Sequence, residues 1–119
     1  MTSIRVMLPK ELRLRNKRDF DKLWKRGRSL HGRLLGIRFA PNQKGDTRLG
    51  IVIGVKIHKR ATKRNTAKRR IREALRREYA PRIHGFDIAV IGRSGIIEAS
   101  YKEITDELGA ILTHAHLLS

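Results

Sequence analysis

The fold is decided by residues 47–91, which read TRLGIVIGVKIHKRATKRNTAKRRIREALRREYAPRIHGFDIAVI. Large and small side chains alternate along residues 47–55, which predicts a strand. Its larger side chains, Leu49, Ile51, Ile53 and Val55, would share one face. Residues 86–91 are apolar and β-branched, as is typical of a buried strand. Between them, residues 62–79 predict a helix that ends before Pro81. This order predicts a βαβ unit with parallel strands.

The predicted helix has two unlike faces. Thr62 is a suitable N-cap. An apolar stripe recurs at helical spacing and consists of Ala67, Ile71, Ala74, Leu75 and Tyr79. The far side carries a polar ridge of Asn65, Arg69, Arg72 and Arg76. We expect the stripe to pack on the sheet and the ridge to face outward.

Other elements flank this unit. A helix is expected over residues 17–26, with Asn16 as its cap, Asp19 in its first turn and Gly27 at its exit. Residues 34–39 predict a strand, and the turn-rich loop 41–46 predicts that it forms a hairpin with residues 47–55. The last helix starts with the capping box Ser100 to Glu103, and its apolar stripe is Ile104, Leu108, Ile111 and Leu112.

These elements together predict the fold class. The order αββαβα indicates a small α+β protein in which helices pack on a single-layer sheet. The length of 119 residues fits one domain, which we expect over residues 1–119, with residues 1–12 as a flexible N-terminal segment.

The charge predicts a polyanionic partner. The chain has 28 Lys+Arg against 11 Asp+Glu, a net charge of +17 that would destabilise the fold without a partner. Residues 56–77 hold eleven basic side chains and one acid, Glu73, whereas residues 93–119 are net acidic. A merely solvated face would mix both signs, so nucleic acid is the favoured partner.

Several function classes are disfavoured. The chain has no cysteine, which excludes disulfides, Cys-based zinc sites and thiol catalysis. There is no apolar run long enough to span a bilayer and no signal peptide, so we expect a cytoplasmic protein without a membrane partner. The carboxylates are not clustered as a metal-dependent nuclease requires, and Asp87 in its apolar strand is expected to be structural. We therefore predict no catalytic residue, no metal ligand and no small-molecule substrate.

The second face of residues 47–55 is unusually bare, since it consists of Gly50, Val52 and Gly54. Glycine in a strand often marks a place where another chain approaches closely. Two interpretations stay open: a helix packed tightly on this face, or the floor of a groove for an extended RNA strand.

Residues 64–72, RNTAKRRIR, resemble the arginine-rich helix of the bacterial ribonuclease P protein family. Further segments resemble the family in the same order: Arg13-Leu14, Asp19-Phe20, Leu23-Trp24, Gly27, residues 49–53 and residues 86–91. The chain departs from the family where Thr66 replaces an arginine and where Arg38 stands near a position often held by an aromatic residue. The loop of residues 55–63 is also one residue longer than usual.

The resemblance implies a fold and an RNA-binding surface. The fold would be ribosomal S5 domain 2-like, with the rare left-handed βαβ crossover. Contacts to the catalytic RNA would come from Lys56, Lys59, Arg60, Lys63, Arg64, Asn65, Lys68, Arg69 and Arg72. Arginine and lysine suit phosphate, whereas Asn65 could equally serve in local capping.

The resemblance also implies a groove for the single-stranded 5′ leader of precursor tRNA, lined by Phe20, Trp24, Gly50, Val52 and Gly54. Stacking on aromatic rings tolerates any base sequence, as a variable leader requires. Plain core packing is the competing explanation for two aromatic residues four apart.

The implied function is that of the protein subunit of a ribonucleoprotein endonuclease. The catalytic RNA and precursor tRNA would be the partners, the RNA would require Mg²⁺, and the protein would bind no cofactor and be inactive alone. The alternatives are a ribosomal or other structural RNA-binding protein, a stand-alone nuclease and a nonspecific DNA-compacting protein.

Overall fold

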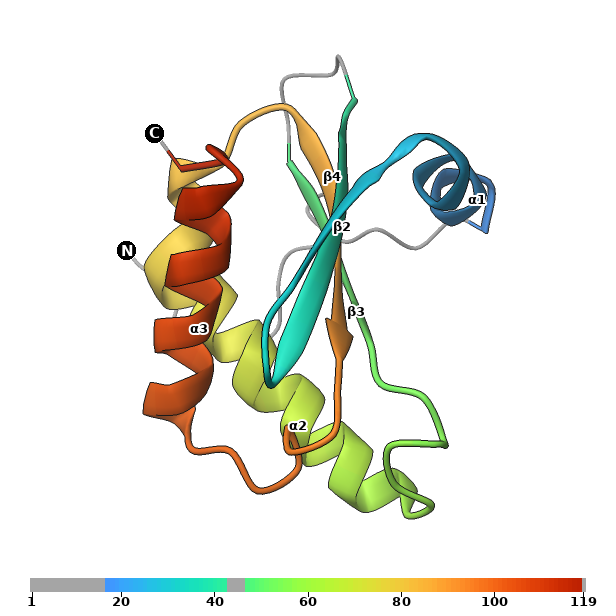
Figure 1. The fold of residues 1–119 in the computed structure, drawn as a ribbon, viewed down its shortest axis with the longest axis vertical. Coiled ribbons are helices and arrows are strands. Elements are labelled where there is room, and N and C mark those ends of the chain that lie inside the picture. The colour runs from blue at the N-terminus through green and yellow to red at the C-terminus, as the bar shows by residue number, and fades with distance from the viewer. Residues whose placement is uncertain (1–16, 43–46, 119) are drawn as a thin grey trace.

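The computed structural model describes residues 17–42 and 47–118 (Figure 1). Its helices are α1 (Lys17–Arg26), α2 (Ala61–Ala74) and α3 (Tyr101–His114). A π-helical turn, η2 (Leu75–Tyr79), and a 3-10 turn, η3 (Ala80–Arg82), continue α2. The strands are β1 (Arg28–His31), β2 (Leu35–Pro41), β3 (Arg48–Val52) and β4 (Phe86–Gly92). Residues 1–12, the expected cap Asn16 and most of the loop 41–46 lie outside the described residues.

The four strands form one mixed sheet in the order β1-β2-β4-β3. Strand β4 pairs parallel with β3, where Leu49 lies opposite Ile88, and antiparallel with β2, where Ile37 lies opposite Val90. The predicted α+β class and the parallel βαβ unit are therefore confirmed, and the hand of the crossover stays a prediction. The predicted hairpin of residues 34–39 with residues 47–55 is wrong, because β4 lies between β2 and β3.

Strand β1 was not predicted, although it pairs antiparallel with β2 at the edge of the sheet. Its sequence, RSLH, is mostly exposed and lacks the alternation that marks a half-buried strand. Its backbone pairing with the apolar strand β2 therefore determines this element.

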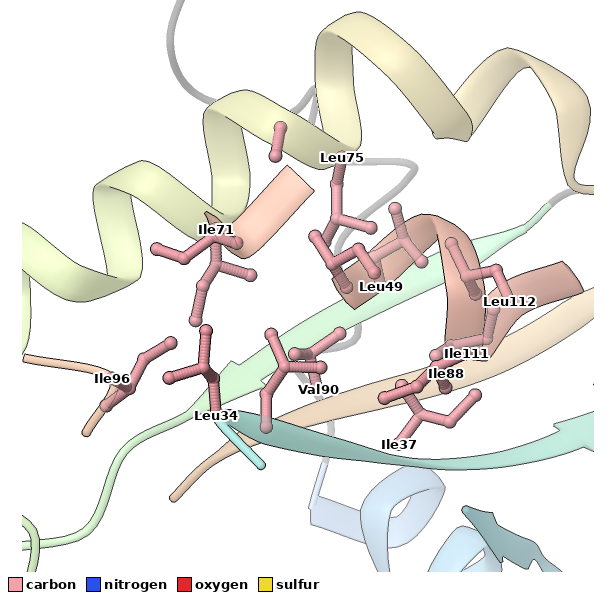
Figure 2. Close-up of a cluster of buried hydrophobic side chains, with 14 of the residues drawn as sticks. Leu34, Ile37, Leu49, Ile71, Leu75, Ile88, Val90, Ile96, Ile111 and Leu112 are labelled. Carbon is pink, nitrogen blue, oxygen red and sulfur yellow. The ribbon is translucent and has the colours of Figure 1, made fainter. Parts of the chain in front are cut away.

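The helices cover the two faces of the sheet unequally, because α2 and α3 lie on one face and α1 crosses the other (Figure 1). Nearly all the buried side chains lie between the sheet and the α2–α3 layer (Figure 2). The predicted apolar stripes are confirmed as buried at Ala67, Ile71, Ala74 and Leu75 of α2–η2 and at Ile104, Leu108, Ile111 and Leu112 of α3. Tyr79 is only partly buried, and its hydroxyl donates to the Thr105 carbonyl at 2.8 Å.

Strand β3 is shorter than predicted. It ends at Val52, and Ile53 still reaches the core, but the chain then turns as Ile57 N–H donates to the Gly54 carbonyl at 3.0 Å. Val55 is 66% exposed beyond the end of β3, so the prediction that it shares a strand face with Leu49, Ile51 and Ile53 is wrong. The turn at Gly54 breaks the two-residue period before the chain reaches Val55.

Helix α2 begins earlier than predicted, with Arg60 rather than Thr62 at the N-cap. Backbone N–H of Arg60 donates to His58 Nδ1 at 3.0 Å, which folds the preceding loop against the helix start. Thr62 lies inside the first turn, where its carbonyl accepts a hydrogen bond from Thr66 Oγ1 at 2.9 Å.

The acidic helix α3 contacts the sheet at the start of β2. Its predicted capping box is confirmed, since Glu103 N–H donates to Ser100 Oγ at 3.1 Å and Ser100 N–H donates to Glu103 Oε1 at 2.8 Å. One turn later, Glu107 Oε2 accepts from the backbone N–H of Leu34 and Leu35 at 2.7 and 2.8 Å. This carboxylate ties α3 to the start of β2.

Candidate nucleic-acid interface

A basic surface covers the start of α2 and the loop before it. Asn65 and Arg69 of the polar ridge are exposed, and Arg72 is partly buried. The remaining predicted contacts are exposed at Lys56, Lys59, Arg60 and Lys63 and partly buried at Arg64 and Lys68. The structure therefore places these residues on one loop and on one helix. With no acidic residue in the first turn of α2, no carboxylate there opposes an anionic partner.

Arg64 has a structural contact as well as a predicted RNA contact. Its Nη1 donates to the carbonyls of His58 and Lys59, each at 2.8 Å. These bonds hold the loop in position beside the helix. A phosphate at this place would meet a guanidinium that is already oriented, which lowers the entropy lost on binding.

Two further arginines, Arg70 of α2 and Arg76 of η2, are engaged within the protein. Arg76 Nη2 pairs with Glu73 Oε1 at 2.7 Å, and its side chain is only 16% exposed, so it is not part of the open basic ridge. Arg70 Nη1 donates to the carbonyls of Ile97 and Ala99, both at 3.3 Å, which links α2 to the segment before α3. The charge of residues 56–77 is thus divided between an outward surface and internal contacts.

An aromatic hollow of about 390 Å³ lies beside α1 on the opposite face of the sheet, lined by Phe20, Asp21, Trp24, Lys25 and Val52. The ring centroids of Phe20 and Trp24 are 6.1 Å apart with the planes at 62°. Trp24 is 47% exposed, whereas Phe20 packs partly against the small cluster of Leu23 and Ala89. Core packing therefore explains the buried part of the Phe20 side chain, but it does not explain the exposed part of the Trp24 ring.

The three residues of the bare strand face have different positions. Val52 lines the hollow, and Gly50 lies buried two residues earlier, on the same face of β3. Gly54 is exposed beyond the end of β3 and is not among the lining residues. Helix α1 packs its one fully buried side chain, Leu23, against Ala89, the β4 partner of Gly50, so helix packing accounts for the Gly50 end of this face. A groove floor at Val52 stays a prediction.

A second hollow, of about 410 Å³, lies on the other side of α1 and contains a bridge around Arg48. The Arg48 guanidinium donates to Asp19 Oδ2 at 2.7 Å and to both Asp87 carboxylate oxygens at 2.8 and 2.9 Å. The hydrogen bond to Asp87 is the main cause that raises the pKa of Arg48, against the opposing effect of burial. Asp87 is structural, as predicted, whereas Asp19 pairs with a side chain rather than only with the helix dipole.

The position near which the family often has an aromatic residue is used differently in this chain. Arg38 of β2 turns toward the end of α1, where Nε donates to the Leu23 carbonyl at 2.9 Å and Nη2 donates to the Trp24 carbonyl at 2.5 Å. Its Nη1 donates to Ser29 Oγ at 2.7 Å. Sequence reasoning missed the roles of Arg38 and Arg48. The sequence held a signal at Arg38, since an arginine between the apolar strand residues Ile37 and Phe39 needs a fixed partner.

Within residues 17–42 and 47–118, no three His, Asp or Glu side chains gather as metal ligands would. No helix in that part of the chain is both long and apolar enough to cross a membrane.

These features define a small, strongly basic α+β protein with one mixed sheet and a βαβ unit. The chain belongs to the ribonuclease P protein family, since the family model described as Ribonuclease P matches residues 8–116. Membership implies an RNA partner in the ribonuclease P complex and a role in tRNA processing.

Curated relatives and solved structures agree with this assignment. The chain is 37% identical over 111 residues to the ribonuclease P protein component of a Picosynechococcus species, covering 92% of this chain and 95% of that protein. It is 35% identical to the ribonuclease P protein component of Microcystis aeruginosa, covering 93% of this chain and 96% of that protein. The Staphylococcus aureus RNase P protein superposes with a TM-score of 0.83 at 29% identity, covering 92% of this chain and 100% of that one. The Thermotoga maritima RNase P protein superposes with a TM-score of 0.77 at 36% sequence identity, covering 86% of this chain and 96% of that one.

Proposed function

We propose that this chain binds both the catalytic RNA of ribonuclease P and the 5′ leader of precursor tRNA. The binding would promote substrate and Mg²⁺ binding during endonucleolytic removal of the leader. The observation that carries the proposal is the division of the protein into an exposed basic surface on α2 and an open aromatic hollow beside α1. The two sites lie on elements that cover opposite faces of the sheet, so both RNAs could be bound at once (Figure 1).

The basic surface suits the catalytic RNA. Arg69 and the lysines of the preceding loop are exposed, so their cations can reach phosphates. Arg76 differs, because it would first have to break its ion pair with Glu73. Each phosphate contact would release counterions, so affinity would fall steeply with salt. The exposure of Asn65 agrees with an RNA contact, since no capping hydrogen bond involves its side chain at the helix start.

The aromatic hollow suits an unpaired strand. The exposed ring of Trp24 offers a stacking surface, and base–aromatic stacking contributes about 1–3 kcal/mol per base with little dependence on sequence. Lys25 at its margin supplies a cation for the backbone of the strand. A leader of variable sequence needs this kind of contact rather than base-specific hydrogen bonds.

Catalysis would belong to the RNA, which would hold the required Mg²⁺. The two carboxylates that face each other beside α1, Asp19 and Asp87, both receive hydrogen bonds from Arg48, which makes them poor metal ligands. The protein alone would therefore be inactive, would need no small-molecule substrate or membrane partner, and would act in the cytoplasm.

The test is multiple-turnover cleavage of a precursor tRNA by a bacterial ribonuclease P RNA at low Mg²⁺, with and without the protein. We expect accurate 5′ cleavage only when both are present. A protein-only reaction with Mg²⁺ and an unstructured mRNA is run beside it, because a mutant of the S. aureus protein is described as defective in mRNA degradation activity. Cleavage by the protein alone, or no stimulation of the RNA, would overturn the proposal.

A further inference from the structure

Helix α1, which carries Phe20 and Trp24, has a small apolar seat on the sheet. Leu23 is its one fully buried side chain, and it meets Ala89 with partial contributions from Phe20 and Ala40. A helix of ten residues is marginal by itself, so its position must come from tertiary contacts. The apolar contacts on this face are few compared with those that hold α2 and α3.

The C-terminal end of α1 is held by Arg38. Its guanidinium donates to the carbonyls of Leu23 and Trp24 in the last turn of the helix, where the Leu23 carbonyl also accepts from the Gly27 N–H at 2.8 Å. A cation at this end also opposes the negative end of the helix dipole. The bond to Ser29 Oγ fixes the guanidinium itself, so the turn that carries Trp24 is tied to β2.

The N-terminal half of α1 is held by Arg48. Its Nη1 binds Asp19, the residue beside Phe20, while its Nε and Nη2 bind Asp87 of β4. The bridge is largely withdrawn from solvent, with side-chain exposures of 18%, 16% and 13% for Arg48, Asp19 and Asp87. Solvent therefore screens it less than it screens an open surface pair.

We infer that Arg38 and Arg48 are positioning residues that fix α1 at both ends and so set the place of Phe20 and Trp24 opposite Val52. Neither arginine needs to touch the leader. They keep the hollow at a fixed width before the strand arrives, which reduces the entropy lost on binding. The consequence for leader binding rests on the function proposed above, whereas the consequence for α1 does not.

The two contacts can be removed without opening the main core. Along β2, Arg38 alternates with the buried Ile37 and Phe39, so its side chain lies on the α1 face. Removing Arg48 would leave Asp19 and Asp87 facing each other, so its contact to α1 is better removed from the other partner. Asp19→Ala cuts the link to α1 and leaves the Arg48–Asp87 pair in place.

The chain contains a single tryptophan, Trp24, so fluorescence reports on α1 directly. We expect faster acrylamide quenching and lower anisotropy of Trp24 in Arg38→Met and in Asp19→Ala than in the wild type. Arg77→Met is the control for Arg38→Met, since it also removes one positive charge, and Arg77, which pairs with Glu73, lies in η2 with a side chain that is 61% exposed. Thermal melts of all three verify that the fold persists. Unchanged Trp24 signals in both variants would overturn the inference without any RNA measurement.

A second measurement addresses the leader, with holoenzymes assembled at saturating protein. The ratio of affinities for a precursor tRNA and for the matching leaderless tRNA should fall by about tenfold in Arg38→Met, in line with the loss of charged hydrogen bonds, and stay unchanged in Arg77→Met. A loosened Trp24 with an unchanged ratio would overturn the positioning role. If the wild type itself shows no preference for the leader, the proposed function fails, and the Trp24 signals still decide whether the arginines hold α1.

Discussion

The buried face of α2 should determine the stability of the fold, and its exposed face should determine RNA binding. The pair of variants Ile71→Ala and Arg69→Ala tests this difference. Ile71 is fully buried and projects from α2 toward the strands (Figure 2). Arg69, two residues away on the same helix, is exposed. A substitution at the first position should damage the core, and one at the second should damage only the surface.

The magnitude for Ile71→Ala follows from its burial. The change removes three carbons from a filled site, and isoleucine-to-alanine changes in cores cost about 2–5 kcal/mol, so we expect about 3–4 kcal/mol. Unfolding entropy of about 2.1 cal/mol/K per residue gives roughly 0.25 kcal/mol/K for the 119 residues. The expected fall in Tm is therefore about 12–16 °C. For Arg69→Ala the free energy of unfolding should change by no more than about 0.5 kcal/mol.

The assay is urea and thermal unfolding followed by circular dichroism, with binding to ribonuclease P RNA measured over a range of salt. Arg69→Ala should lower the slope of log K against log salt by about 0.7–0.9, the loss of one phosphate contact. The account of α2 would be refuted if Ile71→Ala cost less than about 1 kcal/mol, a value too small for a filled core site. It would also be refuted if Arg69→Ala destabilised the fold as much as Ile71→Ala, or left the salt slope unchanged.

Three further predictions concern the supporting elements. Glu107→Gln should cost about 2 kcal/mol in urea unfolding, because two consecutive backbone N–H groups at the start of β2 lose their charged acceptor; a cost within about 0.5 kcal/mol would contradict this. Ser100→Ala should cost about 1 kcal/mol by removing the N-cap of α3, and the free energy of unfolding is the check. Burial, followed by the nearby Glu78, raises the pKa of Tyr79, so the folded state disfavours the ionised phenol. That part of the stability is complete below the ordinary pKa near 10 and is lost as pH rises through the folded value, so the difference between wild type and Tyr79→Phe should shrink above about pH 10 in unfolding measurements.

The parts of the fold that the sequence predicted are those with a local pattern. Period-3.6 apolar stripes located α2 and α3, and Ser100 with Glu103 marked a helix start because capping depends on residues three apart. The parallel pairing of β3 with β4 followed from the order strand, helix, strand.

The errors arose where distant residues decide the structure. The predicted hairpin of residues 34–39 with 47–55 was wrong because β4 lies between these two strands. Strand β4 begins at Phe86, 45 positions after the loop that starts at Pro41. The N-cap was misplaced because the His58 ring and the Arg64 guanidinium fold the loop against the helix. Neither contact has a fixed sequence spacing.

The site was predicted unevenly for the same reason. The polar ridge of α2 follows from helical geometry, whereas the contacts of the loop and the groove were implied by the family resemblance. Trp24 lies beside Val52 in the structure, and the binding of RNA there stays a prediction. The inner contacts of Arg64 and Arg76, the position of Gly54 outside the hollow and the bridge of Arg48 required knowledge of which strands are neighbours.

The central claim is that α2 and the hollow beside α1 bind different RNAs. Its most direct test compares Trp24→Ala and Arg69→Ala in holoenzymes assembled at saturating protein, using precursor tRNAs with a long leader and with a leader of one nucleotide. The account predicts that Trp24→Ala reduces the affinity gained from the long leader by about 5–150-fold, the equivalent of one stacked base, while Arg69→Ala leaves that gain intact and weakens only the protein–RNA assembly. Equal losses of the leader-dependent gain in both variants, or no loss in Trp24→Ala, would contradict it.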